Sequence, residues 1–352
     1  MKQALEQFVK NQGWSLSGIV SYETLQKSLR GHERVFERWL KKGFKADMDW
    51  LQKMKEDRYH PENKLADIQS VIVLGAWYGQ DQETENRKQK TVGQVARYAA
   101  GRDYHKVLKK KLLELCDWLK QQNPKVDTYV AVDSGPTVDR VLAEAAGLGF
   151  FGKNSMIINP SMGSYFFIAS VMTNLNLEET PKKRMPNCGN CTRCIDQCPT
   201  GAIKAPGVID ARRCIAYLTI ENKNGIPVEL RPKIGNRIFG CDICQEVCPF
   251  NVARAHKQEI LIEGLKSKNG VGESLDLRDI LSIKTDGEFL KRFAGTPLMR
   301  AKRRGLLRNA CVVAGNSGEA SLIPDLLAVL ERETDPMLRE HAEWALEQLK
   351  RL

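Results

Sequence analysis

The sequence has no hydrophobic run long enough to cross a membrane. Its longest apolar stretch, residues 71–78, is far shorter than the ~20 residues that a transmembrane helix needs. Residues 1–14 have the spacing of an amphipathic helix and no unbroken apolar block of signal-peptide length. Low-complexity tracts are also absent. We therefore expect a cytoplasmic protein without a membrane partner.

The composition is that of an ordinary globular protein. Hydrophobic residues make up 42% of the 352 positions and charged residues 28%, so a sizeable core can be buried in two or three domains. The formal net charge is +11 and the isoelectric point is about 9.1. Such a charge fits either simple solubility or a polyanionic partner such as nucleic acid, and charge alone does not decide between them.

Residues 1–178 show the mixed pattern of an α+β or α/β domain. Buried strands are predicted at residues 70–76 and 128–132, and an amphipathic helix at residues 104–121. The other expected elements are a turn at residues 133–136, a helix over 137–146, and two strands, 155–158 and 164–172, joined by a hairpin loop at 159–163.

The rest of the chain divides into three segments. Residues 179–255 hold most of the cysteines, residues 256–295 show weak periodicity and are expected to connect domains, and residues 296–352 are helical throughout. The last segment resembles a HEAT-type helical repeat. An ordinary helical cap is the alternative, because only one or two repeats of ~40 residues fit there.

Cysteine is concentrated in one short segment, since eight of the ten cysteines lie between Cys188 and Cys248. A cytosolic chain has little use for disulfides, so this crowding indicates metal. The spacing Cys188-x2-Cys191-x2-Cys194-x3-Cys198, followed by proline, matches the bacterial ferredoxin run. There, three thiolates hold one [4Fe–4S] cluster and the fourth reaches a second. A zinc ribbon needs only two CxxC pairs and would leave cysteines over.

The second half of the run, Cys241-x2-Cys244-x3-Cys248, lacks one cysteine, and Cys214 can supply it from upstream. Four ligands are then available for each of two clusters. The insert of residues 215–240 departs from a simple ferredoxin and is long enough to touch something else. By the crossing rule of two-cluster ferredoxins, cluster 1 takes Cys188, Cys191, Cys194 and Cys248, and cluster 2 takes Cys198, Cys214, Cys241 and Cys244.

The remaining cysteines, Cys116 and Cys311, lie in apolar helical patterns and are expected to be core thiols. A plain two-cluster electron carrier would end after roughly 60 to 80 residues. Here residues 1–187 precede the first cluster cysteine. We expect that long preceding segment to consume or hold the electrons.

Six short motifs outside the cysteines carry a specific resemblance. They lie at residues 97–105, 132–135, 143–150, 152–154, 163–165 and 233–242. With the eight cysteines, these motifs make the chain resemble the epoxyqueuosine reductases, cobalamin-dependent enzymes of tRNA queuosine synthesis, over nearly its full length. That family is similar in turn to the reductive dehalogenases, which also combine cobalamin with two clusters.

The resemblance implies a reaction and its participants. The substrate would be tRNA with a GUN anticodon that carries epoxyqueuosine at the wobble position, and the product would be queuosine-tRNA. The epoxide oxygen would leave as water, with two electrons from an unidentified donor and two protons. Base-off cobalamin would lie between the domain of residues 1–178 and the cluster module of residues 179–255. The helices of residues 296–352 would contact tRNA, and we expect a monomer.

The resemblance assigns Asp133 as the catalytic residue, because the matching family aspartate is the proposed general acid over the cobalt. A carboxyl in an apolar, cofactor-lined pocket can have its pKa raised and so be protonated near neutral pH. From its position alone, before a predicted helix, Asp133 fits an N-cap slightly better. The resemblance reverses that preference.

Further residues are implied to line the cobalamin. The Arg58 guanidinium suits the amide carbonyls of the corrin or the phosphate of the nucleotide tail, although a solvated arginine is the alternative. His105 is left out of the site, because the family binds its cobalamin without a histidine ligand. The residues expected beside the cobalamin are Arg58, Ala96, Asp133, Ile157, Ala216, Cys241 and Asp242.

Basic residues at the start of the helical tail suggest contact with RNA phosphates. A solvated helix face is the alternative, and it would be preferred without a tRNA substrate. The expected tRNA contacts are Lys223 in the insert, followed by Arg300, Lys302, Arg303, Arg304 and Arg308.

Three other functions stay open at this point. The main alternative is a cobalamin and iron–sulfur reductase of the reductive dehalogenase type that acts on a small molecule, although the basic tail and the lack of an export signal argue against it. A non-catalytic electron carrier would bind no corrin. An RNA-binding module with zinc would contain no iron.

Overall fold

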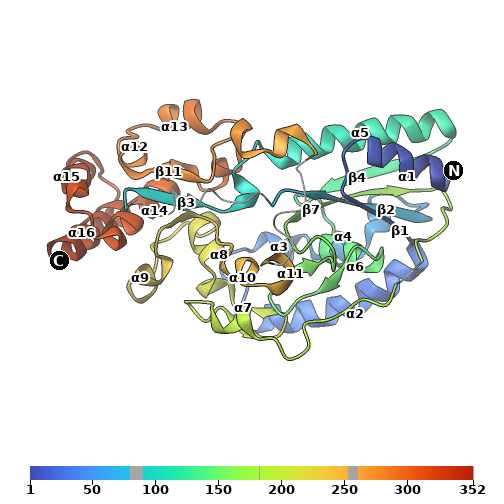
Figure 1. Cartoon of the computed structure of the whole chain (residues 1–352), viewed down its shortest axis with the longest axis horizontal. Helices are drawn as coiled ribbons and strands as arrows, with labels where there is room; N and C mark the ends of the chain where they lie inside the picture. The colour runs from blue at the N-terminus through green and yellow to red at the C-terminus, as the bar shows by residue number, and fades with distance from the viewer. Residues whose placement is uncertain (80–89, 182, 253–260, 352) are drawn as a thin grey trace.

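The computed structural model describes residues 1–79, 90–181, 183–252 and 261–351. Figure 1 shows an elongated molecule, with the N-terminal elements at one end and the C-terminal helices at the other. Within the described ranges, no helix is both long enough and apolar enough to cross a bilayer.

A four-stranded antiparallel sheet organises the N-terminal part. Every neighbouring pair in it is antiparallel, so the structure selects α+β from the two predicted classes. The strands lie in the spatial order β1 (Leu16–Ser21), β2 (Ser70–Trp77), β7 (Phe166–Thr173) and β4 (Thr128–Val132).

Helices cover both faces of this sheet, which is why β2 is buried along its whole length. On one face, α1 and α5 pack against Ile72 and Leu74; on the other, α2 and α6 pack against Val71 and Val73. Alternate residues of one strand therefore serve two separate cores. The helices of this part are α1 (Lys2–Asn11), α2 (Tyr22–Lys41), α3 (Trp50–Lys53), α4 (Lys55–Tyr59), α5 (Tyr104–Gln122) and α6 (Asp139–Ala145).

The hairpin expected within residues 155–172 does not form. β6 (Ile157–Ile158) pairs with β5 (Phe150–Phe151) instead, and only an isolated bridge between Asn159 and Gly163 closes the loop. The physical reason is that β7 is already paired along both edges, with β2 and β4. No edge of β7 is left for β6.

Short helices and turns make up the cysteine-rich module. α7 and α10 come from opposite halves of the cysteine run and pack against each other, so the two halves fold as one unit. The elements are α7 (Arg193–Asp196), β8 (Ile203–Ala205), β9 (Val208–Ile209), α8 (Ile215–Ile220), α9 (Arg231–Ile234), α10 (Ile243–Glu246) and α11 (Pro249–Val252).

A second sheet joins segments that are far apart in the sequence. Its central strand, β3 (Val92–Val95), pairs in parallel with β10 (Arg237–Phe239) and antiparallel with β11 (Ser274–Asp276). The predicted N-terminal domain therefore gives one strand to a sheet shared with the cysteine module and with the predicted connector. The expected domain boundaries cut through this sheet.

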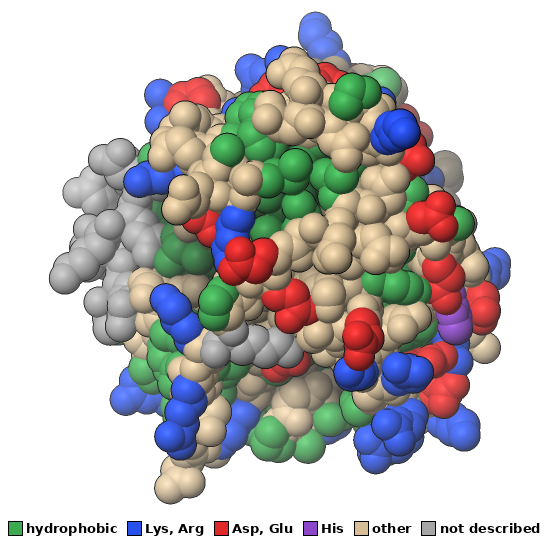
Figure 2. Space-filling view, turned by 90° about the vertical axis from the view of Figure 1, so that its right-hand side faces the viewer, with side chains coloured by type: hydrophobic (Ala, Val, Ile, Leu, Met, Phe, Trp, Pro, Cys, Tyr) green, Lys and Arg blue, Asp and Glu red, His purple; other side chains and the backbone are tan. Residues whose placement is uncertain are grey.

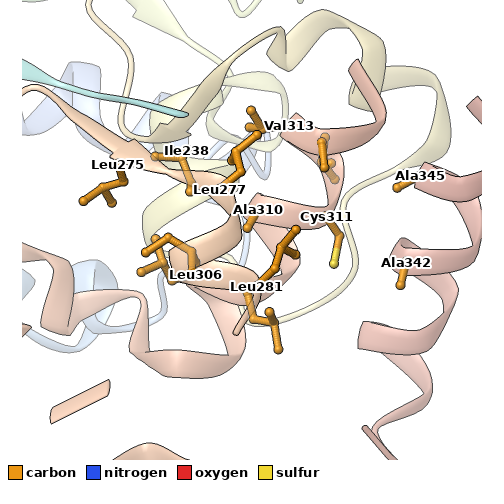
Figure 3. Packing of buried hydrophobic residues seen from close by; sticks show 14 of the residues in the cluster. Ile238, Leu275, Leu277, Leu281, Leu306, Ala310, Cys311, Val313, Ala342 and Ala345 are labelled. Atoms are coloured by element: carbon orange, nitrogen blue, oxygen red, sulfur yellow. The ribbon is translucent and has the colours of Figure 1, made fainter. Parts of the chain in front are cut away.

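The predicted connector, residues 256–295, is a folded part of the C-terminal core in its described portion, residues 261–295. β11, α12 and α13 all contribute buried side chains to one hydrophobic cluster with the last three helices. Figure 3 shows side chains of this cluster, among them Leu277, Leu281, Leu306 and Cys311, converging from different elements. The helices are α12 (Leu277–Leu281), α13 (Asp286–Phe293), α14 (Lys302–Ser317), α15 (Ile323–Arg332) and α16 (Pro336–Lys350).

Leu281→Ala should destabilise the protein strongly, because the Leu281 side chain is 0% exposed in this core. Removing a buried leucine side chain costs ~2–5 kcal/mol of unfolding free energy. Urea unfolding followed by circular dichroism measures the loss. Leu290→Ala on α13 is the matched control, because that side chain is 52% exposed. Equal losses in the two variants would restore the connector interpretation.

Candidate active site

The cysteines of the first predicted cluster lie together. Burial raises the pKa of the Cys194 thiol, and Cys188, Cys248 and Cys191 are close enough to influence it electrostatically. Cys248 in turn interacts electrostatically with Cys188 and Cys191. The fold thus brings the last cysteine of the run back to the first three.

The other four cysteines form a second group. Burial raises the pKa of Cys244, and Cys241 and Cys214 add to the rise. Cys198 neighbours Cys214. The pKa of Cys198 itself is lowered, because hydrogen bonds from Thr200 and backbone N–H groups outweigh the effect of burial. A thiol that accepts such bonds is stabilised as thiolate, the form that binds iron.

The thiols are gathered without closing around a single point. Among the described residues, which include all eight of these cysteines, no three His, Cys, Asp or Glu side chains could hold one metal ion together. A zinc site would need sulfurs ~2.3 Å from one ion. In a cubane each thiolate binds a separate iron corner, so the four sulfurs stay farther apart. The choice of clusters over zinc rests on the ferredoxin spacing of the cysteines in the sequence.

Asp133 lies at the end of β4, where the chain turns with φ 51°. This left-handed conformation is unusual for a residue other than glycine, although Asp tolerates it better than most. The Tyr104 hydroxyl donates a hydrogen bond to Asp133 Oδ2, and His105 Nε2 lies 3.5 Å from the same oxygen. The N-cap alternative is wrong, because α6 begins at Asp139 and its N-cap is Val138.

The start of α5 supplies both partners of this carboxylate. Asp103 is the N-cap of α5 and accepts a hydrogen bond from the backbone N–H of His105. Asp103 Oδ1 also lies 2.8 Å from His105 Nδ1. The imidazole is therefore held between two carboxylates, which fixes its orientation toward Asp133.

The pKa of Asp133 is lowered, which contradicts the rise expected from the sequence. The side chain is 63% exposed, yet it is crowded by protein on its inner side, and this burial pushes its pKa upward. Hydrogen bonds from His105 and Tyr104 outweigh that effect. Burial lowers the pKa of His105, but the bonds to Asp103 and Asp133 raise it to about 9. At neutral pH the proton of this pair sits on His105.

Asp139, a second carboxyl close to Asp133, has the raised pKa that was expected for Asp133. Burial, followed by the charge of Asp133, raises the pKa of Asp139 to about 6. The Thr137 hydroxyl donates a 2.6 Å hydrogen bond to Asp139. The sequence interpretation missed Asp139 and Tyr104 and left His105 out of the site. The last two lie in the 97–105 motif, which was the available signal.

Several buried polar atoms, one beside Asp133 and others beside Asp242, have no hydrogen-bond partner among the described residues. They include Nε of Arg58, Nε of Arg97 and the hydroxyl of Tyr165. The charges of Asp139 and Asp133 act on the Arg58 guanidinium. The Arg97 guanidinium lies over the Tyr165 ring, 4.5 Å from its centroid. Unpaired buried donors are costly, so they fit a cofactor rich in amide and phosphate oxygens. Cobalamin is such a group.

The other expected cobalamin residues fall in three places. Ala96 and Asp242 lie together, because Asp242 accepts a 2.8 Å hydrogen bond from the Arg97 backbone N–H directly after Ala96. The Ala216 backbone bonds to the Cys214 thiol, beside the second cysteine group with Cys241. Ile157 is buried in the core between the sheet and helices α2 and α6.

Most of the side chains that were expected to contact tRNA form hydrogen bonds or ion pairs with other groups of the protein. Arg300 forms two hydrogen bonds to Glu221, Arg303 pairs with Glu333, and Arg304 pairs with Asp335. Lys223 Nζ donates to backbone carbonyls, and Lys302 makes no ion pair with any described residue. The basic side chains are not gathered at the N-terminal end either, where Figure 2 shows Lys and Arg mixed with Asp and Glu.

Arg308 corrects the prediction of a phosphate contact. It is 1% exposed, and its guanidinium donates to the carbonyls of Leu218, Asn222 and Asn224 and to the side chain of Asn309. The side chain therefore braces the insert against α14 and has no face open to RNA. The positive charge of Arg308 therefore stabilises the fold, by binding backbone carbonyls, and does not bind RNA.

Comparison with known proteins identifies close relatives. The family model described as "4Fe-4S double cluster binding domain" matches residues 187–251, and the one described as "Epoxyqueuosine reductase QueG, DUF1730" matches residues 58–134. The epoxyqueuosine reductase of Pseudomonas aeruginosa is 37% identical over 98% of this chain and 94% of its own length. That of Xanthomonas campestris pv. campestris is 38% identical over 96% and 92%.

Solved structures agree with these matches. A crystal structure of an epoxyqueuosine reductase with an epoxyqueuosine-modified tRNA-Tyr stem loop has a TM-score of 0.85 at 32% identity. It covers 99% of this chain and 90% of its own. A Bacillus subtilis epoxyqueuosine reductase, described with an aspartate catalytic loop swung out of its active site, has a TM-score of 0.83 at 31% identity. Its coverage is the same, 99% and 90%.

Cys241→Ala should remove one of two iron centres, because the second cysteine group loses a thiolate while the first stays complete. Iron and sulfide analysis of anaerobically purified protein should show a loss of roughly half. Cys116→Ala, in the core of α5, is the control and should keep the full content. Full iron content in Cys241→Ala would contradict the grouping.

The His105 ion pairs should make stability depend on pH. A histidine whose pKa is about 9 in the folded state, against ~6.5 when unfolded, adds stability that is complete below about pH 6.5. This contribution is lost as pH rises through about 9. The difference in melting temperature between wild type and His105→Gln should be largest near pH 6 and shrink by about pH 10. A difference independent of pH would refute the ion pairs.

Proposed function

The chain belongs to the epoxyqueuosine reductase family, and we propose that it reduces epoxyqueuosine in tRNA to queuosine. The observation that carries this proposal is the Asp133 carboxylate, held by Tyr104 and His105 in a chain that also gathers eight thiols. The structural neighbour solved with a modified stem loop supports tRNA as the substrate. No relative reported above supports the alternative of a small-molecule reductase.

Two [4Fe–4S] clusters and cobalamin are the cofactors. When bound, the clusters pass single electrons and the cobalamin supplies the low-valent metal chemistry that cleaves the carbon–oxygen bond. Base-off binding is proposed, with the unpaired donors of Arg58 and Arg97 directed to the cofactor. The proposed ligands are Cys188, Cys191, Cys194 and Cys248 for cluster 1, and Cys198, Cys214, Cys241 and Cys244 for cluster 2.

The protein's part in the reaction is to deliver one of the two protons to the departing oxygen, and solvent supplies the other. Epoxide removal consumes two electrons and two protons and releases water. The resting proton lies on His105 Nε2, which faces Asp133 Oδ2. We propose that Asp133 takes this proton when substrate displaces solvent, and then donates it to the epoxide oxygen. Tyr104 holds the carboxylate in position from the other side.

RNA contact falls to the cations that remain accessible. Lys302 and Arg300 lie on the surface, and Lys223 lies beside them through its bond to the Arg300 carbonyl. Arg300, Arg303 and Arg304 are paired with Glu221, Glu333 and Asp335, so we assign them weaker roles as phosphate contacts. A lysine that approaches a phosphate without a competing carboxylate gains the most from contact.

Several finer features are part of the proposal. We propose a GUN anticodon in the substrate, a cytoplasmic location because tRNA is modified there, a monomeric enzyme, and an external one-electron donor. The helices of residues 296–352, α14–α16, are proposed to be HEAT-like. Their shared core supports this, because α14 and α15 both pack against α16.

Asp133→Asn should abolish most turnover, because an amide cannot relay a proton from His105 to the epoxide oxygen. General acid–base catalysis contributes roughly 10²- to 10⁴-fold, which sets the expected loss in kcat. The assay is anaerobic incubation with epoxyqueuosine-containing tRNA, cobalamin and a reductant, followed by nucleoside analysis. Cluster content, cobalamin binding and RNA affinity should be unchanged.

Asp127→Asn, in an exposed loop, is the matched control and should retain wild-type turnover. Normal turnover by Asp133→Asn would show that another group supplies the proton, and Asp139 would then be tested next. Absence of queuosine from the wild-type reaction would refute the function itself.

A further inference from the structure

The two cysteine groups differ in their access to solvent. The four residues that separate the cysteines between Cys188 and Cys194 are all exposed. In the second group, by contrast, Gly240 and Asp242 on either side of Cys241 are buried. Figure 1 shows α7, the helix of Cys194, at the lower edge of the molecule, with α10 closer to its centre. A partner protein can therefore approach the first group directly.

Exposed cations surround this first group. Lys183 and Arg184 precede it, and Arg193 lies within it. Lys204 is exposed on β8, which packs against α7. These four side chains form no ion pair within the part of the chain that the structure describes. We call Lys183, Arg184, Arg193 and Lys204 the basic rim.

Lys153 adds a fifth cation from the N-terminal part of the chain. Its Nζ donates a 2.7 Å hydrogen bond to the carbonyl of Gly189, in the loop between Cys188 and Cys191. The Lys153 carbonyl accepts a 2.9 Å hydrogen bond from the backbone N–H of Gly207, between β8 and β9. These two bonds hold a positive charge between the first cysteine group and the hairpin that bears Lys204.

Carboxylates are few on the same face. Asp196 on α7 is exposed and accepts a 2.7 Å hydrogen bond from the Thr192 hydroxyl. Asp210 is paired with Arg212 through hydrogen bonds of 2.8 and 2.9 Å. Glu246 on α10 is half-buried. Between residues 183 and 204 the four cations face a single carboxylate, so this surface attracts an anionic partner.

Uncharged surface lies inside the basic rim. Pro186 lies two residues before Cys188, Pro249 directly follows Cys248, and both prolines are exposed. Met185 packs in one small apolar cluster with the two cysteines. A proline side chain loses almost no conformational freedom on contact. Weak electron-transfer complexes bury less than ~1,200 Å² in total, so a small rigid centre within a charged rim is sufficient for one.

We propose that the basic rim and this apolar centre form the docking surface for an acidic protein that carries one electron. The proposal rests on the proposed function and deepens it, because it names the chemistry of the external donor. In each encounter the reduced carrier loses one electron to the centre held by the first cysteine group, and no bond or proton is exchanged. Two successive encounters supply the two electrons that epoxide removal consumes. Carboxylates around the carrier's own cofactor complement the rim.

An RNA partner fits this surface less well. Proteins that bind single-stranded nucleic acid stack bases on aromatic side chains, and residues 183–204 contain no aromatic residue. The cations proposed to contact RNA belong to a different region, where Lys223 bonds to the carbonyl of Arg300. The rim therefore provides charge without the other features of an RNA site.

Arg184→Glu combined with Arg193→Glu should weaken docking of an acidic carrier roughly tenfold at low salt, because charge steers such encounters. The probe is dye-labelled oxidised flavodoxin, an acidic flavin protein, and its affinity for the cluster- and cobalamin-loaded enzyme is measured by anisotropy. The loss should shrink as salt screens the charges. Lys109→Glu with Lys110→Glu, exposed on α5, changes the net charge equally and should bind like wild type.

The rate of electron transfer gives a second readout. Oxidation of reduced flavodoxin by the same enzyme, followed by flavin absorption in stopped flow, should slow roughly tenfold in the Arg184 and Arg193 double variant. Reduced methyl viologen is a small cation, so it should react at least as fast with this variant as with wild type. Equal slowing with both reductants would overturn the proposal, because the defect would then lie in the metal centre.

Lys183→Glu with Lys204→Glu lies outside the loop from Cys188 to Cys194 and repeats the test if the first double variant loses iron. Weaker binding of flavodoxin alone supports the docking surface. Unchanged flavodoxin binding in both double variants would refute it. An equal loss of affinity for a fluorescent tRNA hairpin would assign the rim to RNA instead.

None of these measurements requires epoxyqueuosine. Docking is therefore decided whether or not the enzyme forms queuosine, and a lack of queuosine would count against the proposed function alone.

Discussion

The contact between the start of α5 and the end of β4 is the constraint on which the site depends. Tyr104 and His105 are consecutive on the first turn of α5, and both reach the Asp133 carboxylate. They can do so because α5 runs along the sheet and the chain returns through β4, so the helix start and the strand end meet. The same packing buries the apolar face of α5 against the sheet. Fold stability and proton placement therefore rest on one helix.

Local patterns in the sequence were sufficient for the elements that pack against near neighbours. The apolar run of β2, the short β4 and the helical spacing of α5 were all predicted to within a residue or so. The cysteine spacing indicated two metal centres because most cysteines of each half of the run are separated by only two or three residues. Asp133 was found through family motifs, since its position alone favoured a helix cap.

Features that depend on distant pairing could not be predicted. β3 lies between β10 and β11, which come from residues more than a hundred positions later. The sequence of Val92–Val95 alone gives no indication of these pairings. The direction of the Asp133 pKa shift needed the positions of Tyr104 and His105, not only the idea of an apolar pocket. The burial of Arg308 could not be predicted for a similar reason, because the carbonyls of Asn222 and Leu218 that it binds lie 86 and 90 residues earlier.

The bracing of the insert by α14 bears on how this fold can be shortened or recombined. Arg308 and Asn309 together bind the carbonyls of Leu218, Thr219 and Ile238, which lie near the two ends of the segment between Cys214 and Cys241. The helical tail is consequently not a detachable RNA-binding appendix. A protease or a gene truncation that removed it would also loosen the loop between Cys214 and Cys241, the proposed ligands of cluster 2, so damage to the tail would reach the proposed electron path as well.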